Sequence, residues 1–277
     1  MSSFEVEIRS RLWARKLARQ ARAWAGAFGL DPLALGKGAI GFPKVIRDYW
    51  EIRGQRSTCS QEWPLRFSAP CLHDYSEPSG TASGHYFHQD LLVAQRVYQS
   101  VPRKHVDVGS RVDGFVAHIA AFREIEVLDI RPCQKRVKNI HFVQCDVMDL
   151  PRHFDDYCDS LSCLHALEHF GLGRYGDSVA RDGHLRGFHN LVRLVRQGGA
   201  LYLSVPLGQQ RIEFNGHRVF DFRTVLQMAE GLMELTRFSY VEDSGELHED
   251  VSLRDERVLS DLKRLFYGCG IFEFAKM

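Results

Sequence analysis

From residue 90 onward, short apolar runs with strand-like spacing alternate with segments whose apolar residues recur at helical spacing. The first pattern predicts buried strands and the second predicts amphipathic helices. The predicted strands are Lys104–Val108, Ile125–Ile130, His141–Cys145, Tyr157–Cys163, Ala200–Val205, Leu235–Val241 and Gly270–Ala275. The predicted helices are Asp90–Ser100, Gly114–Phe122, Gly183–Arg196, Phe222–Glu230 and Arg254–Leu265. This alternation predicts an α/β fold, with a Rossmann-like, mostly parallel, seven-stranded sheet, helices on both faces, and the last two strands as an antiparallel edge.

The first 83 residues do not show this alternation. Residues 4–30 carry apolar side chains at helical spacing with Arg and Lys between them, which predicts a basic amphipathic helix. Such a helix either packs on its own domain or contacts an anionic membrane surface, and both alternatives stay open. Glycine and proline punctuate residues 36–43 and 64–80, around a short predicted helix at Lys44–Arg53. We therefore predict a helical extension or cap over residues 1–83 and a second domain over residues 84–277.

The segment VDVGSRVDG follows the first predicted strand and precedes a helix. It predicts a glycine turn whose backbone N–H groups face a nucleotide-like ligand. A dinucleotide-binding G-x-G-x-x-G turn needs a second glycine where Arg111 stands, so a pyrophosphate is disfavoured. S-adenosylmethionine fits instead, because it carries a ribose and an ammonium group but no phosphate. Gly109, Ser110 and Arg111 are the candidate contacts in this turn.

Acidic residues lie in or after three successive predicted strands, at Asp107, Asp129 and Asp146. An acid at the end of the second strand can accept hydrogen bonds from both ribose hydroxyls, and Ile130 follows it directly. Asp146 is suited to an adenine amino group while Val147 packs on the ring. Asp107 is placed to face the positive end of the ligand. Each Asp has the alternative interpretation of a helix cap or turn residue.

The succession VDVGSRVDG, VLDIRP, FVQCDVMDLP, SLSCLHALEHFGLG and GGALYLSVPLG resembles the class I S-adenosylmethionine-dependent methyltransferases. The resemblance extends from about Gly84 to the C-terminus and is strongest to a bacterial, polysaccharide-associated branch. It implies S-adenosylmethionine as the cofactor, with Asp107 and Gly109 in the cofactor turn, Asp129 as the ribose acid and Asp146 as the adenine contact. The family usually has a second small residue where Arg111 stands.

The segment after the fourth predicted strand supplies candidate acid–base groups. Methyl transfer to a hydroxyl needs the reacting atoms held in line and a base for the proton, and histidine is the usual base. Leu164 precedes His165 and His169, which share a face if the segment is helical, and Glu168 can orient either ring. The alternative is that these residues only support the loop. His and carboxylate at this spacing can bind zinc, but without an H-E-x-x-H pattern or clustered cysteines we expect no metal site.

Two further polar clusters compete for the acceptor. In SGHYFHQD, just before the first helix of the domain, Tyr86 and His88 are candidates for the methionine end of the cofactor or for the acceptor. The alternative is a loop with a helix start at Asp90. In FNGHR, the residues Asn215, His217 and Arg218 offer donors and acceptors suited to a hydroxyl-rich ligand.

His217 is therefore a rival base to His165 and His169, and the identity of the general base stays open.

Composition narrows the functional classes. The net charge of +1 gives no reason to expect nucleic acid as a partner, and no N-P-P-Y or D-P-P-Y motif follows the fourth strand. No Tyr-x-x-x-Lys pair supports a nicotinamide dehydrogenase. The seven cysteines show no C-x-x-C spacing, which predicts buried free thiols in a reducing compartment. With no apolar run of about 18 residues and no signal-like start, we expect a cytoplasmic protein, compatible with a peripheral place at the inner membrane.

The leading hypothesis is an S-adenosylmethionine-dependent O-methyltransferase that acts on a sugar hydroxyl of a bacterial surface polysaccharide or its precursor. The alternatives are a small-molecule or lipid methyltransferase and a non-catalytic cofactor-binding protein with the same fold. The acceptor and the oligomeric state are not determined by the sequence.

Overall fold

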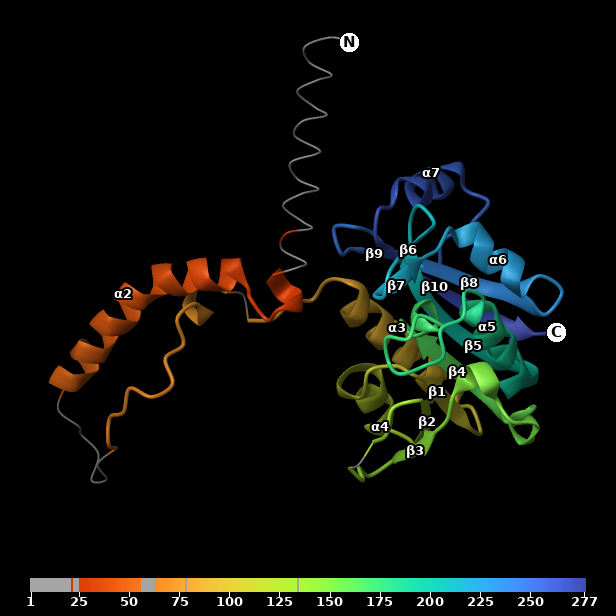
Figure 1. The fold of residues 1–277 in the computed structure, drawn as a ribbon, viewed down its shortest axis with the longest axis horizontal. Coiled ribbons are helices and arrows are strands. Elements are labelled where there is room, and N and C mark those ends of the chain that lie inside the picture. The colour runs from red at the N-terminus through yellow and green to blue at the C-terminus, as the bar shows by residue number, and fades with distance from the viewer. Residues whose placement is uncertain (1–20, 22–24, 56–62, 78, 134) are drawn as a thin grey trace, which may run out of the picture. The chain divides into compact units, whose positions relative to one another are not determined.

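The computed structural model describes residues 21, 25–55, 63–77, 79–133 and 135–277, so most of the predicted basic helix at residues 4–30 lies outside the described residues. The chain separates into two compact units, Met1–Thr81 and Ala82–Met277 (Figure 1). The sequence placed its boundary after residue 83.

In the first unit, helix α2 (Pro32–Gly54) begins at a capping residue, Asp31, whose carboxylate accepts hydrogen bonds from the backbone of Leu33 and Ala34. The prediction of a turn at residues 36–43 was wrong, because α2 runs through its glycines and Pro43. Packing outweighs helix propensity here. A side chain at Gly41 would come within 1.4 Å of the Leu72 carbonyl oxygen, so only glycine fits.

The second unit is built on one eight-stranded sheet of order β3-β2-β1-β4-β5-β10-β8-β9, and a separate hairpin joins β6 to β7. The strands are β1 (His105–Val108), β2 (Ile125–Asp129), β3 (Ile140–Gln144), β4 (Cys158–Leu164), β5 (Val195–Leu207), β6 (Arg211–Glu213), β7 (His217–Val219), β8 (Met233–Val241), β9 (Leu247–His248) and β10 (Gly268–Lys276). Strands β1 to β5 pair with one another in parallel, whereas β10 runs antiparallel to both β5 and β8.

This sheet confirms the predicted Rossmann-like fold. It has eight strands rather than the predicted seven because β9 adds a short antiparallel strand beside β8. The two late strands pair as predicted. However, β10 lies between β5 and β8, and the edge of the sheet beyond β8 is formed by β9.

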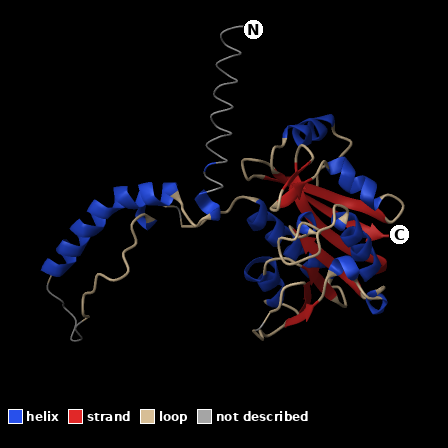
Figure 2. Ribbon diagram, viewed as in Figure 1, coloured by secondary structure: helices blue, strands red, loops and turns tan. Residues whose placement is uncertain are grey.

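Helices cover both faces of the sheet, which runs through the middle of the unit in Figure 2. The helices are α3 (His85–Ser100), α4 (Ala117–Ala120), α5 (Gly183–Leu194), α6 (Phe222–Ala229) and α7 (Glu256–Arg264), with shorter turns η2 (Val112–Val116), η3 (Val147–Asp149), η4 (Arg152–Phe154) and η5 (Leu167–His169), whereas the turn η1 (Asp74–Ser76) belongs to the first unit. The apolar residues of α3 and α4 form one buried cluster with residues of β2, β4 and β10. Those of α5, α6 and α7 belong to another buried cluster. Apolar stripes at helical spacing explain both layers.

Two helix boundaries differ from the prediction in ways that affect the site. Helix α3 begins at His85, so the polar segment predicted as a loop before Asp90 is its first turn. The helix predicted at Gly114–Phe122 begins earlier, with the π-helical turn η2, and ends at Ala120.

Among the described residues, no helix is long and apolar enough to cross a membrane. The prediction of buried thiols holds for Cys158, Cys163 and Cys269, but Cys71 and Cys133 are exposed.

Candidate active site

A cavity of about 360 Å³ lies at the carboxyl ends of β1, β2 and β4. Parallel strands that end at one edge of a sheet create such crevices, and the volume lies within the range of small-molecule sites. Most of the predicted site residues meet there. Those that line the cavity are Tyr86, Gly109, Arg111, Asp129, Ile130, Asp146, Val147, Leu164, His165, Glu168, His169 and His217.

The turn after β1 is a close-packed backbone platform. Gly109 has φ +70°, and its N–H donates to the Leu128 carbonyl at 3.0 Å. A Cβ at this position would lie 3.0 Å from the Cβ of Ala166, so the turn brings β1 close to the chain after β4. Glycine satisfies both the backbone angle and the lack of space.

Asp107 holds this turn from beneath rather than facing a ligand. Its carboxylate is fully buried and accepts hydrogen bonds from the N–H and hydroxyl of Ser110 and from the hydroxyl of Ser162, at 2.6 to 3.0 Å. Burial raises the pKa of Asp107 to about 6, against the opposing effect of the two serines. The Ser110 hydroxyl also accepts from the Leu164 N–H at 3.2 Å, which ties the turn to β4.

Arg111 stands at the rim of the cavity. Its guanidinium donates to both carboxylate oxygens of Asp113, at 3.1 and 2.8 Å, and lies 5.1 Å from the centre of the Tyr86 ring. The side chain remains half exposed, and the missing second glycine is therefore accommodated without crowding the turn.

Asp129 ends β2 at the cavity wall, where Arg131 occupies much of its hydrogen-bonding capacity. One carboxylate oxygen accepts from the backbone N–H and Nε of Arg131, at 2.8 and 3.0 Å, and the other accepts from Nη2 at 2.6 Å. The same guanidinium lies 4.4 Å from the centre of the Tyr175 ring. A carboxylate has about four acceptor positions, so Asp129 can take one more donor, or more if Arg131 turns away.

The segment after β3 provides an acid beside an apolar surface. Asp146 caps η3 and accepts from the Met148 N–H at 2.8 Å, while Val147 and Met148 are nearly buried and line the cavity. Asp146 therefore caps a helical turn, which was the alternative interpretation of this residue, and it also lines the cavity. A planar ring could pack on the two apolar side chains with a polar edge towards this carboxylate.

His165 follows β4 in a strained conformation. Its φ of +49° is unusual for a residue with a side chain, and its N–H donates to the carbonyl and hydroxyl oxygens of Ser204, both at 3.1 Å. Its Nδ1 lies 2.7 Å from a carboxylate oxygen of Glu168, and both side chains are almost completely buried. Burial alone would lower the pKa of His165 and raise that of Glu168, but their pairing, with the Cys269 sulfur beside His165, reverses both directions.

His169 has one ring nitrogen held by a hydrogen bond, and the other has no hydrogen bond to the residues that the structure describes. Its Nδ1 lies 2.7 Å from the Gly216 carbonyl, so it donates the hydrogen bond and Nε2 carries the lone pair in the neutral ring. Nε2 lies 3.8 Å from the Glu168 carboxylate. Burial lowers the pKa of His169 despite this neighbouring charge, so the ring is neutral at physiological pH.

Three more aromatic side chains gather where α3, β7 and β10 meet. The ring of His217 is 5.0 Å from that of Tyr267, which also stacks on His85 at 5.3 Å. Burial lowers the pKa of both His217 and His85, in the latter to about 4. Tyr267, from the loop before β10, also lines the cavity, and no sequence pattern marked it as a site residue.

Arg174 and Tyr175 also line the cavity without having been predicted. Their loop is organised by Asp177, whose carboxylate accepts from the backbone N–H groups of Gly171, Gly173 and Tyr175 at 2.8 to 3.2 Å. The G-x-G spacing before an aspartate was the available signal.

Five of the predicted site residues, all within the described part of the chain, do not line the cavity. Asp107 and Ser110 lie beneath it, His88 is half buried on α3, and Asn215 is exposed in the hairpin turn. Arg218 is 4% exposed and donates to the main-chain carbonyls of residues 168, 170, 180 and 181, so it braces the loop rather than contacting an acceptor.

A family model described as "Caenorhabditis protein of unknown function, DUF268" matches residues 111–264. No curated protein matches the sequence.

Several solved structures are similar to the chain in fold. The 1,6-didemethyltoxoflavin-N1-methyltransferase of Burkholderia thailandensis, crystallised with 1,6-didemethyltoxoflavin and S-adenosylhomocysteine, is 13% identical over 68% of this chain and 78% of its own, with a TM-score of 0.48. The N-methyltransferase NodS of Bradyrhizobium japonicum WM9, in complex with S-adenosylhomocysteine, is 15% identical over 70% and 88%, with a TM-score of 0.46. The [4+2]-cyclase SpnF is 12% identical over 73% and 90%, with a TM-score of 0.47.

Proposed function

Because the chain belongs to the family described as Caenorhabditis protein of unknown function, DUF268, and that description gives no activity, we propose a function from the geometry of the cavity. The protein transfers a methyl group from S-adenosylmethionine to an oxygen atom of its acceptor. The observation that carries this proposal is the convergence of the glycine turn, two strand-end acids and a buried His–Glu pair on one cavity.

The half of the cavity formed by β1, β2 and β3 suits the cofactor. Asp129 can accept from the ribose hydroxyls, and the adenine can pack on Val147 and Met148 with its amino group towards Asp146. The backbone at Gly109 passes close to the ligand without a pyrophosphate cradle. A sulfonium cofactor without phosphate fits this half better than a dinucleotide does.

The half formed by the β4 loop, β7 and Tyr267 suits the acceptor. We assign His169 as the general base, because its Nε2 makes no hydrogen bond to the described residues and its lowered pKa favours the neutral ring. Bound S-adenosylmethionine would supply a methyl group on a sulfonium, whose carbon–sulfur electron pair would return to sulfur as the acceptor oxygen takes the methyl carbon. The hydroxyl proton passes to Nε2 of His169, where the new positive charge faces the carboxylate of Glu168.

The acceptor we propose is a sugar hydroxyl, in a surface polysaccharide or its precursor. Sugars are bound by aromatic faces combined with hydrogen-bonding side chains, and Tyr175 and Tyr267 with Arg174 and His217 offer both. The polysaccharide context rests on the resemblance seen in the sequence.

Calorimetric titration tests the cofactor assignment. Asp129→Asn should weaken S-adenosylmethionine binding by about 10- to 100-fold, because a charge-assisted hydrogen bond contributes about 1.5–3 kcal/mol. The matched control is Asp156→Asn, which alters a carboxylate that pairs with Lys276 away from the cavity lining. A folded protein that binds neither S-adenosylmethionine nor S-adenosylhomocysteine would overturn the proposal.

Turnover tests the acceptor half. Wild-type protein is incubated with S-adenosylmethionine and a panel of free and nucleotide-activated hexoses, and S-adenosylhomocysteine release is followed. His169→Gln should lower the turnover number by about 100-fold or more with cofactor affinity retained, whereas the exposed His153→Gln control should not. If His217→Gln abolishes turnover and His169→Gln does not, the base has been misassigned.

A further inference from the structure

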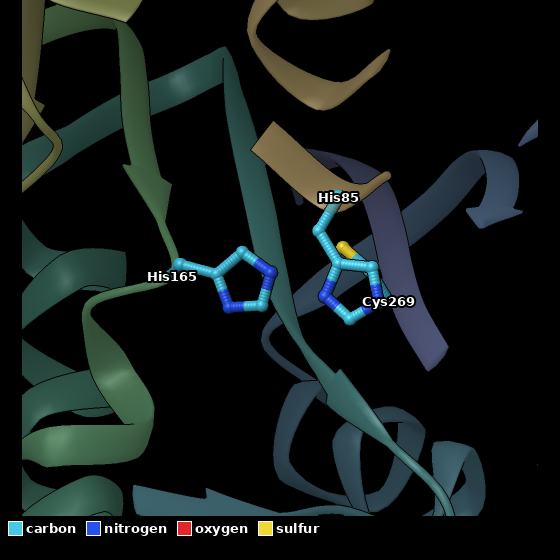
Figure 3. A group of neighbouring side chains, drawn as sticks. All are labelled: His85, His165 and Cys269. Carbon is cyan, nitrogen blue, oxygen red and sulfur yellow. The ribbon is translucent and has the colours of Figure 1, made fainter. Parts of the chain in front are cut away.

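Three side chains of kinds that can bind metals come from distant parts of the chain and meet beside the cavity (Figure 3). His85 begins α3, His165 follows β4 and Cys269 belongs to β10, and their ligand atoms all lie within 4.8 Å of one another. The two imidazole planes are 2° apart with ring centres separated by 5.2 Å. In Figure 3 a nitrogen of each ring faces the other, and the Cys269 sulfur lies beside the His85 ring.

His165 is oriented as a metal-binding histidine is. Its Nδ1 donates to Glu168, which leaves Nε2 directed away from that carboxylate. By hydrogen-bond geometry Nε2 has no partner among the described residues, although the His165 side chain is only 3% exposed, and the Cys269 sulfur lies close enough to interact with this ring. Buried polar atoms are almost always paired, so an unpartnered one at this depth indicates a missing group.

The surroundings of this nitrogen favour a cation. Glu168 is 1% exposed, and one of its carboxylate oxygens also has no hydrogen-bond partner in the described part of the chain. A ring nitrogen of His85 hydrogen-bonds to the backbone of Tyr267. Histidines that bind metals usually donate their other ring nitrogen to a carboxylate or a backbone carbonyl, and these two histidines have one partner of each kind.

We propose that His85, His165 and Cys269 bind a zinc ion. Two imidazoles and a thiolate suit zinc, a borderline-soft ion that takes nitrogen and sulfur ligands at about 2.0–2.3 Å in a tetrahedron. Ligand atoms around such an ion lie about 3.5 Å apart, so these side chains close on it by small rotations. Three protein ligands leave one position open, which is the arrangement of catalytic rather than structural zinc.

The open position would be used from the cavity, since His165 and Tyr267 line its wall. An acceptor hydroxyl bound there would lose its proton more readily, because zinc lowers the pKa of oxygen ligands. This inference goes beyond the proposed function and does not depend on it, as metal binding is measured without cofactor or acceptor.

Cobalt(II) substitution provides the direct test, on protein freed of any histidine tag. We expect one equivalent of Co²⁺ to give the sulfur-to-cobalt charge-transfer band of a thiolate ligand, and Zn²⁺ to displace it. Cys269→Ser should remove that band and His165→Asn should remove binding, while Cys133→Ser, at an exposed thiol, should change neither. A spectrum unchanged in Cys269→Ser, or no saturable binding by the wild type, would overturn the proposal.

Two further measurements do not depend on how well the ligand variants fold. Zn²⁺ at 100 times its dissociation constant should raise the melting temperature of the wild type by about 5–10 °C. Glu168 is a positioning residue, so Glu168→Gln should weaken Zn²⁺ binding by about 10- to 100-fold and keep the charge-transfer band at saturation. A wild-type melting temperature unaffected by Zn²⁺ would contradict the site.

Discussion

The buried carboxyl group of Asp107 makes the unfolding free energy of the second unit depend on pH, and the substitution Asp107→Asn removes this dependence. Its pKa is raised by burial from 3.8 to about 6 in the folded protein. The difference of about 2 units corresponds to about 3 kcal/mol of unfolding free energy. Since the folded pKa lies above the unfolded one, this contribution is fully present below about pH 4 and is lost as the pH rises through 6. About half of it remains at pH 5.

The substitution Asp107→Asn keeps the side-chain shape and removes the titration. Unfolding free energies of wild type and variant are measured by urea denaturation at intervals from pH 4 to pH 8. The wild type should lose about 2–3 kcal/mol relative to the variant across this range, whatever the offset between them. Other groups titrate in both proteins and cancel in the difference.

Circular dichroism is the suitable signal for that experiment. All four tryptophans, at positions 13, 24, 50 and 63, lie in the first unit, so their fluorescence does not report on the sheet. A difference that stays constant within about 0.5 kcal/mol between pH 5 and pH 8, or that rises with pH, would refute the raised pKa of Asp107.

Three further predictions concern the glycine turn at Gly109, the carboxylate of Asp129 and the loop held by Arg218. Gly109→Ala should cost about 1–3 kcal/mol of unfolding free energy and weaken S-adenosylmethionine binding, because a methyl group meets Ala166 and the backbone angle is left-handed; unchanged binding and stability would contradict the close approach. Arg131→Gln should strengthen S-adenosylmethionine binding up to about fivefold by releasing Asp129 from its ion pair, and a tenfold weakening in calorimetry would mean that Arg131 itself holds the ligand. Arg218→Met should lower the unfolding free energy by about 2–4 kcal/mol, since it leaves buried carbonyls without donors; a stable variant with lost activity would return Arg218 to the acceptor site.

The sequence predicted the sheet and the cavity residues at the ends of β1, β2 and β3, because both depend on local patterns. Strand ends are visible as apolar runs that stop at an acid, and parallel strands bring Asp129 and Asp146 to one edge. Even the pairing of Asp129 with Arg131 was within reach, since the two are only two residues apart.

The acceptor half depends on contacts that no local pattern shows. Cys269 reaches His165 across about a hundred residues and Tyr267 lines the same cavity, and the position of β10 in the sheet brings them there. His85 was read as part of a loop because Gly84 and its polar neighbours look like a turn, whereas they start a helix. A pattern within one segment does not show the approach of His85, His165 and Cys269 either.

The place of β10 has a consequence for how the protein is made. Residues 268–276 fill the gap between β5 and β8, although they are the last strand in chain order. A nascent or truncated chain that stops before residue 268 exposes one ladder edge on β5 and another on β8, both rich in apolar side chains. Unpaired edges of this kind recruit strands from other molecules. Premature termination should therefore yield aggregates rather than a smaller folded protein.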